Sequence, residues 1–136
     1  MHDANSLIQI YADAFSRGDV DAVCACFSSD AVIHDLLDGT LSSARFAWTE
    51  LISAFHVQLR IDALCTEGAV VVARYREQGK FVAPFRGFPP TGRSYEVTAI
   101  HWFEIEGGKF VRRWGARNTA SIGRQIGISN DHTNVA

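Results

Sequence analysis

The sequence predicts an α+β domain in which three N-terminal helices pack on one face of a curved, mixed or antiparallel sheet. Two observations carry this prediction. Apolar residues recur at helical spacing through the first part of the chain, and from Val57 onward they alternate with polar residues as in half-buried strands. Because helices and strands are segregated along the chain, we expect two layers around one core. The 136 residues suit a single domain at 1–128, followed by a flexible polar tail at 129–136.

The helices are predicted from apolar stripes and capping residues. Gly18 breaks the first helix and Asp19 caps the second, while Ser42 or Ser43 is the expected cap of the third. The expected elements, in order, are a helix over 5–17, a helix carrying 20–27, a turn at 28–30, a short strand at 31–35 and a helix carrying 48–55.

The strands follow from alternation and from glycine-rich turns. A turn at Glu67-Gly68 and another at Glu106-Gly107-Gly108 separate pairs of strand-like segments, which indicates antiparallel hairpins. The expected strands are one from residue 57 to the first turn, then 69–77, 80–86, 94–105 and 109–118, with a short helix or coil through residue 125.

Composition excludes several classes of function. A net charge of -2 gives no electrostatic basis for binding nucleic acid or an anionic membrane. No apolar run approaches the roughly 20 residues that span a bilayer, and we expect no signal peptide because the N-terminus lacks its basic and apolar regions. Cys24, Cys26 and Cys65 have no metal or redox spacing, so we expect apolar core residues in a reducing cytoplasm.

Neither a metal nor a cofactor is expected. No two of the five histidines have ligand spacing on a common element. The glycine pairs lack the context of a nucleotide-binding loop.

Strand geometry divides the side chains of the last hairpin between the two faces of the sheet. If His101 points toward the helices, Phe103 does too, while Trp102 points away, and so does Trp114 on the partner strand. Two tryptophans on an outer face predict a homodimer through that face. The alternative is that Trp114 packs under the C-terminal segment.

Several short motifs, each weak alone, occur in an order and at spacings that together are specific for one fold. They are Tyr11-Ala-Asp-Ala-Phe15, Gly18-Asp19-Val-Asp-Ala22, Phe27-Ser-Ser-Asp-Ala-Val32, His34-Asp35, Gly87-Phe88-Pro89-Pro90-Thr91-Gly92-Arg93, Phe103-Glu-Ile-Glu-Gly107-Gly108-Lys109, Trp114 and Arg124-Gln125-Ile126-Gly127. Over roughly residues 6–127 the chain resembles the cone-shaped NTF2-like superfamily and, within it, the SnoaL-like polyketide cyclase family.

This resemblance implies an aldol ring closure without cofactor, in which a strand histidine and an aspartate on the partner strand act as acid and base. His101 matches the histidine, whereas the aspartate position falls on Gly115. The related ketosteroid isomerases imply a second arrangement, with Tyr11 as hydrogen-bond donor, Asp35 as base and His101 as donor to, or acid for, the enolate.

The expected catalytic residues are therefore His101, Asp35 and Tyr11. The expected substrate-binding residues are Arg113, Arg117, Phe103, Trp48 and Phe15. Each has a structural alternative: Tyr11 and His101 as core residues, Asp35 as a turn residue, and the arginines as partners of Asp35 or Glu77. His34 alternates with Asp35 and is expected on the other face.

Two functions from different classes remain open. The first is an enzyme that cyclises, isomerises or dehydrates a small, apolar, carbonyl-bearing and polyketide-like molecule through an enol or enolate. The second is a non-catalytic module that binds a small molecule or assembles with partners, because this fold hosts both kinds. A hydroxylase or epoxide hydrolase of the same shape is a third option.

Overall fold

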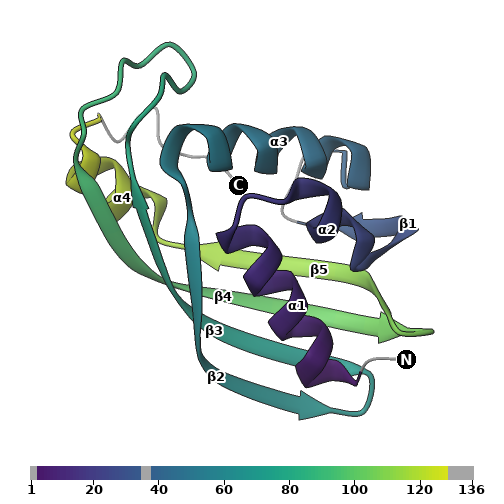
Figure 1. Cartoon of the computed structure of the whole chain (residues 1–136). Helices are drawn as coiled ribbons and strands as arrows, with labels where there is room; N and C mark the ends of the chain where they lie inside the picture. The colour runs from purple at the N-terminus through teal and green to yellow at the C-terminus, as the bar shows by residue number, and fades with distance from the viewer. Residues whose placement is uncertain (1–2, 35–37, 129–136) are drawn as a thin grey trace.

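The computed structural model describes residues 3–34 and 38–128 (Figure 1). Their elements are α1 (Ala4–Ser16), α2 (Val20–Ala25), β1 (Phe27–Ile33), α3 (Leu41–Phe55), β2 (Gln58–Glu67), β3 (Val70–Lys80), β4 (Ser94–Glu106), β5 (Lys109–Arg117) and α4 (Thr119–Ile126). The predicted tail at 129–136 lies outside the described residues, as does Asp35.

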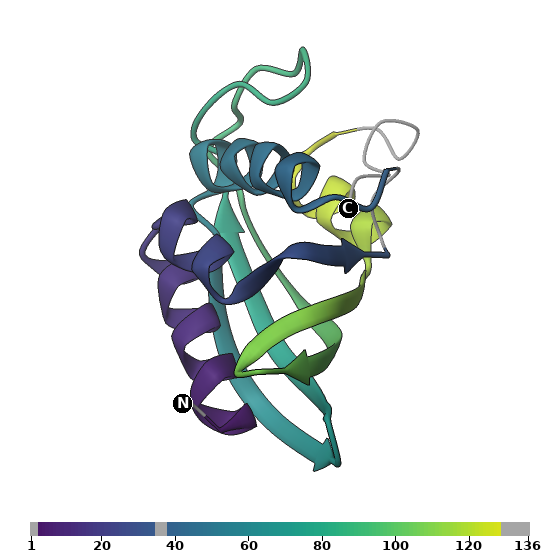
Figure 2. The same cartoon turned by 90° about the vertical axis from the view of Figure 1, so that its right-hand side faces the viewer.

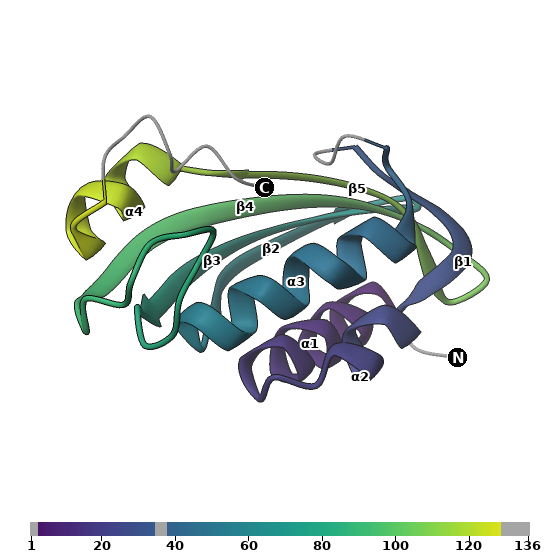
Figure 3. The ribbon, with the colours of Figure 1, turned by 90° about the horizontal axis from the view of Figure 1, so that it is seen from above.

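The strands form one mixed sheet in the order β1-β5-β4-β3-β2. Strands β2 to β5 pair in antiparallel fashion, and β1 joins β5 in parallel. Helices α1, α2 and α3 cover one face of this curved sheet (Figures 1 and 3). Helix α4 follows β5 and lies beside the first residues of β4, where Gln125 bonds to the Glu96 backbone. The predicted α+β class, with three N-terminal helices on a curved mixed sheet, is confirmed.

Side-chain caps set the start of each N-terminal helix. Asp3 and Asp19 accept hydrogen bonds from backbone N–H groups of α1 and α2, as predicted for Asp19. The predicted cap of α3 is wrong: Thr40, rather than Ser42 or Ser43, is the N-cap and accepts from the Ser43 N–H at 3.1 Å. Asp38 fixes this start by accepting from both the Thr40 N–H and the Ser43 hydroxyl.

The turn predicted at 28–30 is wrong, because these residues belong to β1. Their polar composition is typical of turns, but β1 is an edge strand, where exposed polar side chains are tolerated. The register between β1 and β5 shifts between Phe27 and Val32. The residues predicted as a turn lie within this irregular part of the β1–β5 pairing.

The strand predicted at 80–86 is also wrong. After Phe81, which still pairs with Gly92 and Arg93, the Val82 N–H bonds to the Ala54 carbonyl at the end of α3. The chain then turns back on itself at a Phe85–Phe88 bridge. Two left-handed residues, Arg86 and Gly87, make that turn, so the segment forms a loop above α3 (Figure 2).

The core between helices and sheet is rich in aromatic residues. The ring cluster at its centre comprises Tyr11, Phe15, Phe27, Trp48, Phe103 and Phe110. Cys24 and Cys26 are buried nearby, and desolvation raises the pKa of the Cys26 thiol to about 11. Cys65 corrects the prediction of three core thiols, since it is exposed near the end of β2.

Candidate functional site

The helix-covered side of the sheet, here the inner face, holds His101 near the middle of β4. His101 is buried, as are its neighbours on the same face, Ala99 and Phe103. Ile100 and Trp102 point to the opposite, outer face and are exposed. The predicted division of β4 between two faces is therefore confirmed. His101 lies directly opposite Gly115 on β5, as expected from the hairpin spacing.

Arg113 fixes the protonation of His101. Its guanidinium Nη2 lies 2.9 Å from His101 Nε2. Arginine only donates hydrogen bonds, so Nε2 accepts and the proton of the neutral ring is on Nδ1. Burial, reinforced by the charges of Arg113 and Arg117, holds the pKa of His101 well below its ordinary value. The imidazole is therefore neutral at physiological pH.

The predicted site residues of the helices surround this pair. The Tyr11 ring lies edge-on to His101, with 6.0 Å between ring centroids, and is fully buried. The Arg113 guanidinium carbon stands 5.6 Å from the centroid of the Trp48 ring. Phe15 packs against both Tyr11 and Trp48. The structure thus brings most of the predicted site residues into one cluster on the inner face.

A second polar cluster lies farther along the inner face. Glu77 is buried, accepts a 2.5 Å hydrogen bond from the Tyr95 hydroxyl and lies 3.5 Å from Arg117. Of the alternatives left open for the two arginines, Arg117 thus takes the pairing with Glu77. Gly79 makes the geometry possible, because a Cβ there would meet the Tyr95 ring at 2.4 Å. We name Glu77, Tyr95 and Arg117 the paired cluster.

Tyr75 is an inner-face residue that the sequence analysis did not select. It is fully buried, and its ring centroid lies 4.9 Å from that of His101. Within the described parts of the chain, neither the Tyr75 hydroxyl nor His101 Nδ1 has a hydrogen-bond partner. The sequence does hint at this position, because Tyr75 lies two residues before Glu77 on one strand and must therefore point to the same face.

Asp35, the predicted base, lies outside the described residues. His34, the last described residue before it, donates its backbone N–H to the Arg113 carbonyl at 2.8 Å. The His34 ring stacks on Trp114 on the outer face, with centroids 4.2 Å apart. His34 therefore lies away from His101, as the alternation predicted.

The cross-strand neighbours of His101 on the inner face have small side chains. Ala73 and Gly115 flank His101 across the sheet, and Ala99 lies between Tyr75 and Arg117 in the next row. Arg117 keeps 14% of its side chain exposed although it points inward. Arg117 is thus the partly exposed end of this row.

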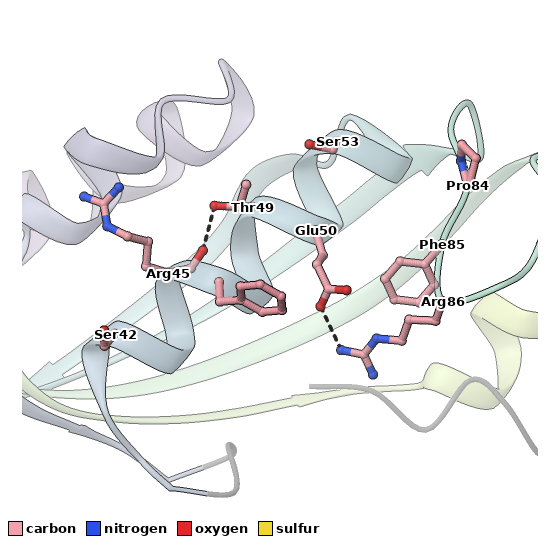
Figure 4. A pocket seen from close by; sticks show the side chains of 9 residues that line it. Ser42, Arg45, Thr49, Glu50, Ser53, Pro84, Phe85 and Arg86 are labelled. Carbon is pink, nitrogen blue, oxygen red and sulfur yellow. Dashed lines mark hydrogen bonds and ion pairs between the residues drawn. The ribbon is translucent and has the colours of Figure 1, made fainter.

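A separate groove of about 580 Å³ lies between α3 and the loop at 84–86 (Figure 4). Glu50 and Arg86 form an ion pair of 3.1 Å across it. None of the predicted site residues lines this groove, so it is distinct from the cluster around His101.

No described helix is long and apolar enough to cross a membrane. No three His, Cys, Asp or Glu side chains among residues 3–34 and 38–128 are arranged to hold a metal ion.

The chain belongs to the SnoaL-like polyketide cyclase family, whose model matches residues 5–126. No curated protein matches the chain.

Solved structures share the fold of this chain. TsrD from Streptomyces laurentii is 26% identical with a TM-score of 0.81, over 93% of this chain and 98% of that one. IdmH from Streptomyces antibioticus, a proposed polyketide cyclase, is 24% identical with a TM-score of 0.81, over 93% and 100%. AclR from Streptomyces galilaeus, a proposed hydroxylase, is 23% identical with a TM-score of 0.79, over 90% and 94%. The last two likenesses show the fold alone.

Proposed function

We propose that this protein is a cofactor-independent enzyme that acts through an enol or enolate on a small, carbonyl-bearing, polyketide-like molecule. The reaction is a cyclisation, an isomerisation or a dehydration. The observation that carries the proposal is His101, an imidazole whose burial lowers its pKa and whose contact with Arg113 leaves its N–H on Nδ1. Membership of the SnoaL-like family supports the class of enzyme.

In the proposed chemistry, Asp35 removes the proton from the carbon next to the substrate carbonyl. The electron pair of the broken C–H bond moves toward the carbonyl oxygen and forms the enolate. Tyr11 and His101 donate hydrogen bonds to that oxygen, where the negative charge develops. Because His101 is neutral, it stabilises the enolate by donation from Nδ1–H and does not supply the proton of an imidazolium.

The enolate then has three fates. In a cyclisation its carbon bonds to a second carbonyl, whose oxygen takes the proton; in an isomerisation the proton returns to another carbon of the conjugated system; in a dehydration the C–O bond of the neighbouring carbon breaks and the hydroxyl leaves with the proton as water. Phe15, Trp48 and Phe103 are the proposed apolar contacts of the substrate. Arg113 and Arg117 are the proposed contacts of its polar substituents, Arg117 at the partly exposed end of its row.

The test is exchange of α-protons with deuterium, because enolisation is the step that all three reactions share. The probe is 2-tetralone in deuterated water, followed by NMR. Loss of one donor to the developing oxyanion typically costs roughly 10²- to 10³-fold in rate, and we expect this loss for His101→Gln and a comparable or larger one for Asp35→Asn.

His34→Gln is the matched control, since it removes a histidine from the outer face only. Equal exchange by His101→Gln and His34→Gln would contradict the mechanism.

A second candidate function is binding without turnover. The observation that favours it is Gly115, which faces His101 at the position that the family resemblance assigns to an aspartate. A protein that binds 2-tetralone and exchanges none of its protons would support this alternative.

We also propose a homodimer through the outer face. Four of the exposed large apolar side chains lie there: Val32, Ile100, Trp102 and Trp114. We name these four the outer patch. Together they offer roughly several hundred square ångströms of apolar surface, a core for the approximately 800 Å² per partner of a stable interface. A sheet face packed on its own copy is self-complementary under two-fold symmetry.

Three free cysteines, with Cys65 exposed, support a cytoplasmic location as part of the same proposal, because thiols stay reduced there.

A further inference from the structure

Two tyrosines on the inner face differ in how their hydroxyls are satisfied. Tyr95 and Tyr75 are both buried, on the neighbouring strands β4 and β3. The Tyr95 hydroxyl donates to Glu77. The Tyr75 hydroxyl has no hydrogen-bond partner among the described residues, and it is closed to solvent. Buried polar groups are nearly always hydrogen-bonded, so an exception calls for an explanation.

The second exception lies beside the first. His101 packs against Tyr75, and its Nδ1 is likewise buried and without a partner within 3–34 and 38–128. The tautomer that Arg113 imposes makes this nitrogen a donor. Two neighbouring side chains on one face therefore each hold an unused O–H or N–H, whereas the Tyr95 hydroxyl next to them is bonded to Glu77.

A small residue separates these groups from a partly exposed one. Tyr75, Ala99 and Arg117 form one row across the sheet, and Arg117 keeps 14% of its side chain exposed. Ala99 contributes only a methyl group between them. A planar ligand that entered beside Arg117 would pass over Ala99 before it reached Tyr75 and His101.

We propose that the Tyr75 hydroxyl is a substrate contact, and that Tyr75 and His101 Nδ1–H together bind the carbonyl oxygen that becomes the enolate oxygen. This inference rests on the proposed function and adds to it a donor that Tyr11, Asp35 and His101 do not supply. Two donors on one oxygen favour substrates in which that oxygen is unhindered and lies in the plane of the conjugated system. Aromatic or polyketide-like ketones fit this description.

The experiment compares Tyr75→Phe with Tyr95→Phe, which remove the same atom from two buried tyrosines. Loss of an unsatisfied hydroxyl removes a desolvated polar group, so Tyr75→Phe should raise the Tm by about 3 to 5 °C. Tyr95→Phe should lower the Tm, because it leaves the buried Glu77 carboxylate without its donor. A Tm that falls in Tyr75→Phe would show that its hydroxyl already has a partner, and would overturn the inference.

The binding arm uses 2-naphthol, whose oxygen sits on a conjugated carbon as in an enolate, with fluorescence as the readout. Tyr75→Phe should weaken its binding about tenfold, the value of one hydrogen bond to a charged or polarised oxygen. Tyr95→Phe should bind it within about twofold of the wild type at a temperature where both are folded.

The outcomes separate the inference from the proposed function. If the wild type binds 2-naphthol and exchanges 2-tetralone, and Tyr75→Phe does both equally well, the inference fails and the proposed function stands. If the wild type does neither, the proposed function fails and the inference fails with it.

Discussion

The two faces of the sheet carry opposite chemistry on the same strands. On the inner face, β4 places His101 among buried aromatic rings, with its charge suppressed by burial and by two arginines. On the outer face, the next residue, Trp102, is 45% exposed and touches Trp114 edge-on. An ionisable group is thus buried on one face and large apolar groups are exposed on the other. This contrast is the reason for proposing a small ligand on the inner face and a second copy of the chain on the outer face.

The largest expected effect tests the outer face. Trp114→Glu places a carboxylate in the centre of the outer patch, twice per dimer, so we expect the dimer dissociation constant to rise by at least about 10³-fold. Sedimentation velocity at micromolar concentration measures it.

The matched control is Phe46→Glu, which changes an aromatic residue that is 70% exposed on α3, away from the outer face. A wild-type protein that sediments as a single species near 15.0 kDa would rule out the dimer.

The next largest effect concerns the inner face and is the pH dependence of the free energy of unfolding. Above an ordinary histidine pKa, His101 is neutral in both folded and unfolded states. Below it, the unfolded chain binds a proton that folded His101 does not, because burial, Arg113 and Arg117 lower its pKa. The free energy of unfolding should therefore fall as the pH drops, by at most about 2 kcal/mol at pH 5.

Urea unfolding between pH 7.5 and 5 measures this loss. The groups that face His101 are Arg113 and Arg117 on β5, Tyr75 on β3 and Tyr11 on α1, so no second histidine or carboxylate is among them. His101→Gln should flatten the dependence, whereas His34→Gln should leave it in place. Equal slopes in the wild type and His101→Gln would show that His101 is not the source.

The smallest effect concerns an ion pair at the rim of the outer patch. Arg112 and Glu104 lie 3.2 Å apart, with 51% and 30% of their side chains exposed. In a monomer, Glu104→Gln should cost about 0.2 to 1 kcal/mol, as expected for a solvated pair. The variant Trp114→Glu provides that monomeric background.

In the wild type a covered face would shield the same pair from water and increase its contribution. A Glu104→Gln effect that is identical in the two backgrounds would mean that the outer face stays solvated.

Local patterns predicted most of the fold and half of the site. Alternation along 94–117 was sufficient to place His101 inward, Trp102 outward and Gly115 opposite His101. Composition misled where long-range partners decide the structure. The 28–30 segment is a strand only because β5 lies beside it, and the 80–86 segment leaves the sheet because α3 offers the Ala54 carbonyl.

The buried polar arrangement was only partly predictable. Arg117 and Glu77 suggest a pair by charge alone. That Tyr95 reaches Glu77 depends on the absent side chain of Gly79, and that Tyr75 lacks a partner depends on every neighbour at once. The hydrogen-bond partners of buried side chains depend on three-dimensional packing, which one sequence does not reveal.

The parallel pairing of β1 with β5 has a consequence for how the chain acquires its structure. Phe27 pairs with Phe110, so this contact closes a long loop that contains α3 and three strands. Loop closure of this length is entropically costly and tends to come late in folding. During synthesis, α1, α2 and β1 emerge well before β5, the strand against which β1 aligns. The nascent chain therefore carries β1 without its partner strand until β5 leaves the ribosome, and Arg113 reaches His101 only then.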